Sequence, residues 1–486
     1  MKNILKKQST LFFLLILLAE ALSFSGYLWP NMTKVGFVII CLATIFLAVK
    51  NLRYALLLML VELIIGSKGY LFFYEINGAF VSIRIAMWLL VMSFWLASVV
   101  SLAIKNKRFP NLLPDFAYAK YFYGLIIAIV WGAVMALFRS NDYSNIFFDL
   151  NNWFYLSLLF PIVTSFKTKE DWQLLKKILG LAVAWLCFKT LFLLYFFSHD
   201  LFDANLTVYR WLGASGVGEV TKLASGFFRI FFQSHIYALM ALFLLLPIWV
   251  EKFNNKIRSR REWWLINALL SIIIIALSRS FWVGLGAGLI TLLIWLIKTK
   301  VGAKQIFKLI GLFFGNVILS LVIITVIIKF PLPTIGQNIS AWDALNDRGQ
   351  LNESAVSSRW SLIPKLWQAI KVSPIVGLGF GKTVTYESSD PRILSQTVSG
   401  TYETYAFEWG WLDIWLKMGI LGVLTYLLLL IKLIRNSLNQ KQIGLALCLI
   451  VLACVHFFTP YLNHPLGLGI IILSAAWLNS QKNLKA

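Results

Sequence analysis

Charged residues are scarce in this chain, and the acidic ones are the scarcest. Only 13% of the 486 residues are charged, 59% are hydrophobic, and the mean hydropathy is +0.77. A soluble globular domain carries about 25% charged residues, so this composition excludes that class. The alternating segments of about ten residues that a transmembrane β-barrel requires are also absent.

The short motifs of nucleotide and metal chemistry are missing as well. The sequence has no Walker A motif, no dinucleotide-binding glycine fingerprint and no His-rich or paired-cysteine metal motif. The cysteines have no metal spacing, and we expect no disulfide between them. All four lie inside apolar runs: Cys41, Cys187, Cys448 and Cys454. We therefore predict no cofactor and no metal.

What the chain has instead is a series of apolar runs of about twenty residues, the length of a membrane-spanning helix. We predict an all-α fold, a polytopic transmembrane helical bundle of about 12–14 spans, with one large outer loop that contains short amphipathic helices. The run at 54–66 is short for a span, so the count falls if it is tilted or re-entrant. The predicted spans are 11–29, 34–49, 54–66, 79–104, 121–139, 152–166, 179–198, 226–250, 264–278, 281–297, 309–328, 411–431, 443–460 and 467–479.

The basic residues predict the orientation of these spans. The net charge of +23 at first suggests nucleic acid, but Lys and Arg cluster between alternate spans, where they orient a membrane protein. We expect a multi-pass protein of the cytoplasmic (inner) membrane, with both termini cytoplasmic, membrane lipids as partners and no nucleic acid. Residues 1–328 then form eleven transmembrane helices, 329–410 the large outer loop, and 411–486 the C-terminal transmembrane helices. The basic N-terminus resembles a signal peptide without a cleavage site, and we expect a retained first span.

Two polar residues open the predicted span 226–250. Arg229 is expected in its first turn on the outer side, and His235 about 9 Å deeper at the helical rise. A buried arginine in a span usually has an anionic partner. The alternatives are that Arg229 snorkels to the interface and that His235 only makes a hydrogen bond between helices.

A second outer arginine lies in the tight turn Ser278-Arg279-Ser280, between two apolar runs. Arginine is disfavoured on the outer side of a membrane protein, so its presence there needs a reason. We predict that Arg279 has a functional role, with a hairpin anchor as the alternative.

The large loop contains a third arginine. Apolar residues recur every three or four positions at Trp360, Ile363, Trp367 and Ile370, which predicts an amphipathic helix on the outer membrane surface with Arg359 at its start. Pro374 is expected to end that helix. Gly377 and Gly379 allow close backbone approach to whatever binds.

Carboxylates mark the junction between the loop and the next span. Glu408 and Asp413 are either solvated caps or functional groups, and Glu403 is a nearby competitor. Three outer arginines suit a diphosphate, because arginine pairs bidentately with phosphate and keeps its charge. A carboxylate beside them suits deprotonation of a sugar hydroxyl. The set predicts glycosyl transfer from a lipid-linked diphosphate.

At this point the sequence resembles the O-antigen ligase and Wzy-type polysaccharide polymerase superfamily, over about residues 225–431. The resemblance lies in the order and spacing of four motifs: Gly226-Phe-Phe-Arg229, Ser278-Arg279-Ser280, Arg359 followed by Pro374 and Gly377-Leu-Gly379, and Gly419-Ile-Leu-Gly422. It implies an inverting, metal-independent glycosyltransferase that acts on an undecaprenyl-diphosphate-linked glycan at the outer face of the cytoplasmic membrane. The acceptor is a glycan or a lipid.

The resemblance also assigns roles. Arg279, Arg359 and Glu408 are the predicted catalytic residues. Where the family has His-Asn-x-Tyr-Leu shortly before the Gly-x-x-Gly motif, this chain has Glu408-Trp409-Gly410-Trp411-Leu412. Glu408 is therefore expected to act as the acceptor-side base. The predicted substrate-binding residues are Arg229, His235, Arg279, Arg359, Gly377, Gly379 and Asp413.

Two other classes stay open. A transporter or flippase of lipid-linked glycans would place charges near the membrane midplane and repeat one half of the chain. The midspan candidates are Glu20, Glu62, Arg84 and Lys189, but they form no recognisable relay and no repeated half is visible. A non-catalytic member of the same family is the third reading.

Overall fold

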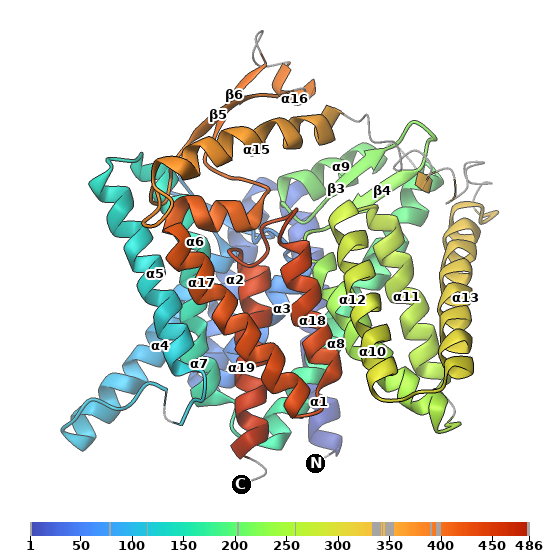
Figure 1. The fold of residues 1–486 in the computed structure, drawn as a ribbon, viewed down its shortest axis with the longest axis horizontal. Helices are drawn as coiled ribbons and strands as arrows, with labels where there is room; N and C mark the ends of the chain where they lie inside the picture. The colour runs from blue at the N-terminus through green and yellow to red at the C-terminus, as the bar shows by residue number, and fades with distance from the viewer. Residues whose placement is uncertain are drawn as a thin grey trace.

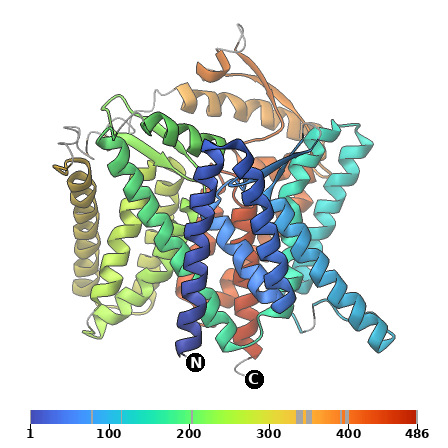
Figure 2. The ribbon, with the colours of Figure 1, turned by 180° about the vertical axis from the view of Figure 1, so that it is seen from behind.

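The fold is known from a computed structural model and is a bundle of helices between two faces (Figure 1). The structure describes residues 2–76, 79–113, 115–201, 204–257, 259–332, 342, 344–345, 354–388, 391–394 and 400–483. Both described ends of the chain lie at one face, which we call the terminal face. The opposite face carries α9, α15 and all three strand pairs, and we call it the loop face (Figures 1 and 2).

The helices follow the apolar runs, and every predicted span overlaps one of them. They are α1 (Lys2–Leu28), α2 (Pro30–Lys50), α3 (Leu52–Ile65), α4 (Ile83–Asn106), α5 (Ala119–Phe138), α6 (Tyr143–Phe154), η1 (Tyr155–Leu158), α7 (Leu159–Ser165), α8 (Lys169–Ser198), α9 (Ala204–Ala214), α10 (His235–Asn254), α11 (Arg260–Ala276), α12 (Arg279–Lys298), α13 (Ala303–Ile328), α15 (Ser354–Val372), α16 (Pro391–Leu394), α17 (Gly410–Asn439), α18 (Ile443–Val455) and α19 (Pro465–Asn483).

Ten helical segments of the described chain are long and apolar enough to cross a membrane, which confirms a polytopic helical membrane protein. A helix satisfies its own backbone groups, which the hydrocarbon interior cannot do. The short α3 is about 21 Å long at the helical rise. Its residues 55–65 are all buried inside the bundle, so this helix need not match the thickness of the lipid.

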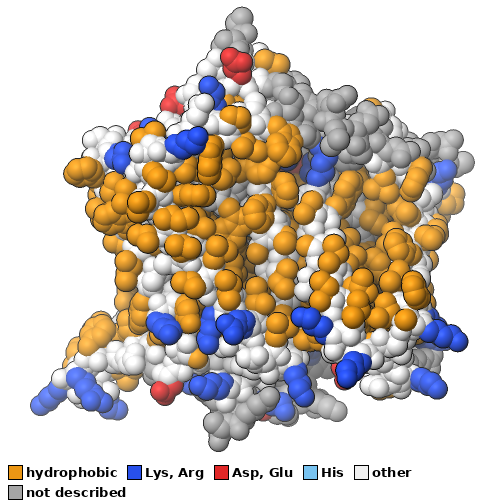
Figure 3. Space-filling view, in the orientation of Figure 1, with side chains coloured by type: hydrophobic (Ala, Val, Ile, Leu, Met, Phe, Trp, Pro, Cys, Tyr) orange, Lys and Arg blue, Asp and Glu red, His pale blue; other side chains and the backbone are white. Residues whose placement is uncertain are grey.

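Charge is distributed unevenly between the two faces. On the side shown in Figure 3, hydrophobic side chains form a band across the middle of the molecule, and Lys and Arg gather along its edge at the terminal face. Basic residues occupy the last turns of helices that end there: Lys50, Lys105, Lys252, Lys298 and Lys482. These positive charges also interact favourably with the partial negative charge at the C-terminal ends of their helices.

Three antiparallel strand pairs in the described part of the chain lie at the loop face and were not predicted. They pair β1 (Phe73–Ile76) with β2 (Ala79–Ser82), β3 (Glu219–Lys222) with β4 (Phe228–Phe231), and β5 (Val384–Glu387) with β6 (Thr401–Thr404). Two predicted spans are corrected by them, because the run 79–104 begins as β2 and the run 226–250 begins as β4. A short apolar run does not distinguish strand from helix by periodicity alone.

The large loop folds over the end of the bundle around α15. This helix ends at Val372, just before Pro374, as predicted. Leu362, Leu366 and Ile370 are buried against the rest of the protein, while Trp360 and Trp367 remain exposed. Contact of this helix with the membrane surface stays a prediction. The leucines pack in a small separate core with residues of the loop and α17: Leu378, Val384, Phe407 and Leu416.

The midspan charges form ion pairs inside the bundle. Lys189 donates to Glu20 over 2.7 Å, and Arg84 donates to Glu62 over 2.8 Å, with all four side chains less than a tenth exposed. The first pair joins α1 to the distant α8, and the second joins the consecutive helices α3 and α4. Paired charges of this kind hold helices together, because leaving one of them unpaired in a buried site is costly.

Candidate active site

The loop and α17 meet at a contact between Arg359 and Glu408. Arg359 Nη2 donates to Glu408 Oε1 over 2.9 Å, and Arg359 Nε forms an ion pair with Oε2 of the same carboxylate. The side chains are 47% and 48% exposed, so solvent reaches both. The structure therefore brings together two predicted catalytic residues that lie far apart in the sequence.

Indole rings frame this contact. Trp409 Nε1 donates to the carbonyl oxygen of Arg359 over 2.9 Å, which fixes the second turn of α15 against the N-cap of α17. Arg359 is the sixth residue of α15 and not its start, which corrects the prediction from the sequence. The ring of Trp409 also contacts Trp360 edge-on at 5.4 Å and Phe458 at 5.5 Å. Trp360 contacts the Trp409 ring and not the small core of the loop, and its side chain remains 58% exposed.

The segment between α18 and α19 connects this frame to the start of α12. The Gly410 N–H donates to the carbonyl oxygen of His456 over 3.1 Å. Thr459 Oγ1 lies 3.0 Å from Ser280 Oγ, and the Tyr461 ring is 6.2 Å from Phe281. Residues 278–281 and 408–411 therefore border one stretch of the loop face.

Arg279 is the first residue of α12, directly after the left-handed turn at Leu277, as a tight turn between two spans requires. Its neighbours Ser278 and Ser280 are buried, with their hydroxyl oxygens 3.0 Å apart. The half-buried Arg279 thus lies where α12 meets the segment 459–461.

Arg229 approaches the same place from a different element than predicted. It lies on β4 and not in the first turn of a span, so its depth is set by the hairpin. Arg229 Nε donates to the carbonyl oxygen of Ala276 over 2.9 Å, and its guanidinium lies 4.7 Å from the Phe231 ring. Because Phe231 contacts Phe281 at 6.0 Å, Arg229 and Arg279 flank the same junction of α11 and α12.

His235 is also corrected in position. It is the first residue of α10 and does not lie a further turn and a half into a span. The ring is fully buried, accepts a hydrogen bond from the Phe232 N–H, and lies 2.9 Å from Thr190 Oγ1. These contacts fix β4 and α8 against α10, and a role for His235 in substrate binding stays a prediction.

The loop glycines make their close approach to the protein's own helices. Gly377 has φ +80°, and a Cβ there would lie 2.5 Å from the Gly419 nitrogen. Gly419 itself has a non-helical conformation that kinks α17. Gly379 donates its N–H to the Lys417 carbonyl oxygen over 3.1 Å and abuts α5. The glycine motif thus seats the loop in the kink of α17, and substrate contact at Gly377 and Gly379 stays a prediction.

Asp413 lies in the first turn of α17, and its side chain points into the bundle. Lys417 Nζ is 2.6 Å from Asp413 Oδ1 and 2.7 Å from Asp149 Oδ1. The second Asp149 oxygen accepts the Gly381 N–H over 2.7 Å, and Asn463 donates to Asp413. This buried group, which we call the Lys417 cluster, joins α6, α17, the glycine motif and the segment before α19.

Sequence reasoning missed three residues next to the site. Asp149 gave no signal, because its partners Lys417 and Gly381 lie in distant elements. Lys417 lies four residues after Asp413 on the same helix, and this spacing was a signal that the sequence analysis did not use. The third is His456, whose buried ring lies 4.9 Å from the ring of Trp411. Its Nδ1 accepts the Leu462 N–H, so in the neutral ring Nε2 carries the proton, and Nε2 has no partner in the described structure. The only hint in the sequence is a polar residue at the end of an apolar run.

The fold and the site define a multi-pass membrane protein in which a charged pair, Arg359 and Glu408, is exposed to solvent where a long loop meets the helical bundle. Residues 264–427 match the family model described as O-antigen ligase. No curated protein and no solved structure matches the chain. The matched segment runs from α11 to α17 and includes Arg279, Arg359 and Glu408. The resemblance to the O-antigen ligase-like superfamily is confirmed, and it indicates a membrane enzyme of ligase or polymerase type.

Proposed function

We propose that this protein is a glycosyltransferase that moves a glycan from undecaprenyl diphosphate, or a related polyprenyl diphosphate, to a glycan or lipid acceptor. The contact between Arg359 and Glu408 supports this most directly. It combines a diphosphate-binding group and a base, is open to solvent, and lies inside the segment that matches the family. Ligase and polymerase differ only in the acceptor.

Three arginines would hold the donor. Arg229, Arg279 and Arg359 come from β4, α12 and α15, and their surroundings are joined through residues 456–461. A guanidinium pairs with two phosphate oxygens at once and stays charged at any physiological pH. In this proposal the arginines neutralise the charge that develops on the departing diphosphate, without a metal.

Glu408 would act on the acceptor. Its carboxylate takes the proton from an acceptor hydroxyl as that oxygen bonds to the anomeric carbon of the donor sugar. The bond from the anomeric carbon to the diphosphate oxygen breaks on the opposite side, and polyprenyl diphosphate leaves with the electron pair. The configuration at that carbon is inverted. His235, Gly377, Gly379 and Asp413 stay predicted binding residues.

The resting contact between Arg359 and Glu408 fits this sequence of events. An ion pair in solvent contributes only about 0–1 kcal/mol, so it opens at little cost. A diphosphate presents more negative charge to Arg359 than one carboxylate does. Donor binding would thus draw Arg359 away and leave Glu408 free to accept a proton.

We also propose that the loop face is the outer face of the cytoplasmic membrane and that both termini are cytoplasmic. The gathering of Lys and Arg at the terminal face supports this orientation (Figure 3). Cysteine replacements at two exposed residues, Thr385 on the loop face and Lys107 after α4, test it with an impermeant thiol reagent. If the reagent added outside labels Lys107→Cys but not Thr385→Cys, the protein has the opposite orientation and this proposal is wrong.

The decisive experiment is a transfer assay in nanodiscs with a purified polyprenyl-diphosphate oligosaccharide and a panel of acceptors. Glu403→Gln is the matched control for Glu408→Gln, because Glu403 lies on β6 opposite Thr385 and is exposed. Transfer that survives Glu403→Gln but not Glu408→Gln supports the proposal. Movement of the donor across the bilayer without any transfer would instead favour the flippase alternative.

A further inference from the structure

A second polar site lies on the loop face, between the ends of α1 and α2. It is a pocket of about 370 Å³, within the range of about 300–1,000 Å³ that small-molecule sites occupy. Its lining residues come from both sides of the turn between α1 and α2 and from the first strand pair. Figure 2 shows this turn at the loop face. Its lining combines α1, α2, β1 and α9: Ser23, Gly26, Tyr27, Asn31, Thr33, Lys34, Tyr70, Leu71, Phe73, Glu75, Trp211, Ala214 and Ser215.

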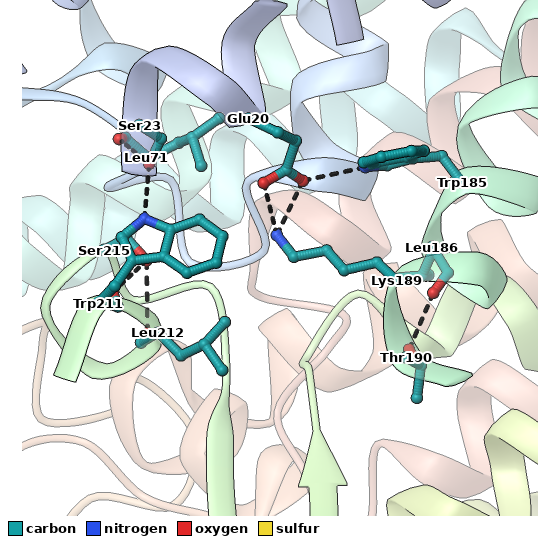
Figure 4. A network of polar contacts seen from close by, with 10 residues as sticks. All are labelled: Glu20, Ser23, Leu71, Trp185, Leu186, Lys189, Thr190, Trp211, Leu212 and Ser215. Carbon is teal, nitrogen blue, oxygen red and sulfur yellow. Dashed lines mark hydrogen bonds and ion pairs between the residues drawn. The ribbon is translucent and has the colours of Figure 1, made fainter. Parts of the chain in front are cut away.

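The floor of the pocket is a fixed indole ring. Trp211 Nε1 donates to Ser23 Oγ over 3.1 Å, and Ser23 Oγ donates to the Leu71 carbonyl oxygen over 3.1 Å (Figure 4). The ammonium group of Lys189 lies 4.8 Å from the centre of the same ring. The ring is 8% exposed, and its position is set before any ligand arrives.

The ammonium below the floor is itself held in place. Lys189 donates to both oxygens of Glu20, over 2.7 and 2.8 Å, and Trp185 Nε1 donates to Glu20 as well (Figure 4). This buried ion pair therefore supports the pocket floor from within the bundle. The Glu20–Lys189 pair thus has a structural role that does not depend on transport.

The walls offer polar groups that the protein does not use. The side chains of Asn31 and Glu75 are exposed and make no hydrogen bond or ion pair within the described structure. Lys34 has a contact with the Tyr74 ring at 5.8 Å and no carboxylate partner there. One positive and one negative group balance each other, which disfavours an anionic headgroup and favours a neutral ligand with many hydroxyl groups.

The aromatic residues of the lining point to the same ligand class. Tyr27, Tyr70, Phe73 and Trp211 supply ring surfaces beside the polar groups. One face of a pyranose ring carries mainly C–H groups and packs on such surfaces, while its hydroxyl groups form hydrogen bonds at the edge. Rigid amphipathic side chains serve this mixed recognition well.

One residue of the pocket lining interacts with the large loop. Tyr70, at its edge, lies near enough to interact electrostatically with Tyr405 of the large loop. Burial, and next the charge of Asp149, raise the pKa of the Tyr405 hydroxyl. Tyr405 lies three positions before Glu408 in the chain.

We propose that this pocket is a carbohydrate-binding subsite, which holds sugars of the glycan at a distance from the bond that reacts. The proposal rests on the proposed glycosyl transfer for its purpose but not for its test. Binding of the lipid-free glycan is measured directly. Donors that carry a longer glycan then gain affinity from the pocket, while a donor with a single repeat does not.

The test uses full-length protein in nanodiscs of phosphatidylethanolamine and phosphatidylglycerol. The probe is the oligosaccharide pool that mild acid releases from the producing cell's own lipid-linked glycans, labelled with a fluorophore at the reducing end. The test variant is Asn31→Ala with Glu75→Ala, both exposed and therefore compatible with folding. The control is Glu219→Ala, an exposed glutamate on a neighbouring hairpin that does not line the pocket.

We expect wild type and Glu219→Ala to bind the probe alike. We expect the double variant to bind about tenfold more weakly, because hydrogen bonds from sugar hydroxyls to a charged group and an amide are lost. Equal binding by the double variant, or no binding by wild type, would overturn the proposal. So would native mass spectrometry that finds a phospholipid retained by wild type and lost from the double variant, without probe binding.

A transfer assay on the same nanodiscs separates this proposal from the proposed function. Pocket-dependent binding without transfer to any acceptor would refute the transfer and keep the subsite. Transfer with unchanged probe binding in the double variant would do the reverse. Where both hold, the double variant raises KM for long-glycan donors and leaves KM for a single-repeat donor unchanged.

Discussion

Glu408 and Asp413 are carboxylates five residues apart, one just before α17 and one in its first turn, and they have opposite surroundings. Glu408 is about half exposed and pairs with an arginine from the loop, whereas Asp413 is 4% exposed and pairs with Lys417 inside the bundle. The first contact opens at little cost, and the second does not. The difference teaches that position at the loop-to-span junction does not define a role, because the direction in which a side chain points decides whether substrate reaches it.

The largest expected effect comes from removing the exposed carboxylate. Glu408→Gln should lower the transfer rate by a factor of about 10²–10⁴, since a general base contributes this much. Stability should stay within about 0.5 kcal/mol, as for most exposed sites. Single-turnover kinetics and thermal unfolding in detergent measure the two effects. Asp413→Asn is the matched variant. If it slows transfer more than Glu408→Gln does, the buried carboxylate matters more for transfer than the exposed one, against this prediction.

Removing the positive partners should come next. Arg279→Ala or Arg359→Ala should slow transfer by a factor of about 10²–10³, the usual loss for one positioned electrostatic donor. Arg359→Lys should recover little, because the bidentate fork is lost. The exposed Lys365→Ala on α15 serves as the control in the same assay. Wild-type rates in both alanine variants would mean that these arginines only anchor their helices.

The buried side of the comparison is tested through stability. Lys417→Met leaves Asp149 and Asp413 buried without their cation and should destabilise the fold by about 3–5 kcal/mol. The midpoint of unfolding in detergent measures this, with Lys365→Met as the exposed control. A replacement that is tolerated would show that the Lys417 cluster does not hold the loop on the bundle.

The smallest effect is a change in pH dependence. Model carboxylates of Glu titrate near pH 4.3 and imidazoles near 6.5, and a base works only when deprotonated. Between pH 7.5 and 5.5, Glu408→His should therefore lose about tenfold in rate, while wild type loses less than about twofold. Parallel pH profiles of the two proteins would contradict Glu408 as the base.

Much of this architecture follows from local pattern. Every predicted apolar run overlaps a helix, and α15 ends just before Pro374, because hydrophobic length and proline act within a few residues. The arginines and Glu408 were also identified from sequence, since a charge beside an apolar run is visible without its partner. The hairpins were missed because β2 and β4 continue into apolar runs and gave no separate signal.

By itself the sequence determined a polytopic helical membrane protein and its likeness to the O-antigen ligase family. The tertiary structure alone decided which charges meet. Arg359 pairs with Glu408, Lys417 pairs with Asp149, and Lys189 lies against the ring of Trp211, and many residues of the chain separate the two members of each contact. A burial pattern repeats along the chain and can be read locally. A partner is chosen by how distant helices pack, and that depends on the whole bundle.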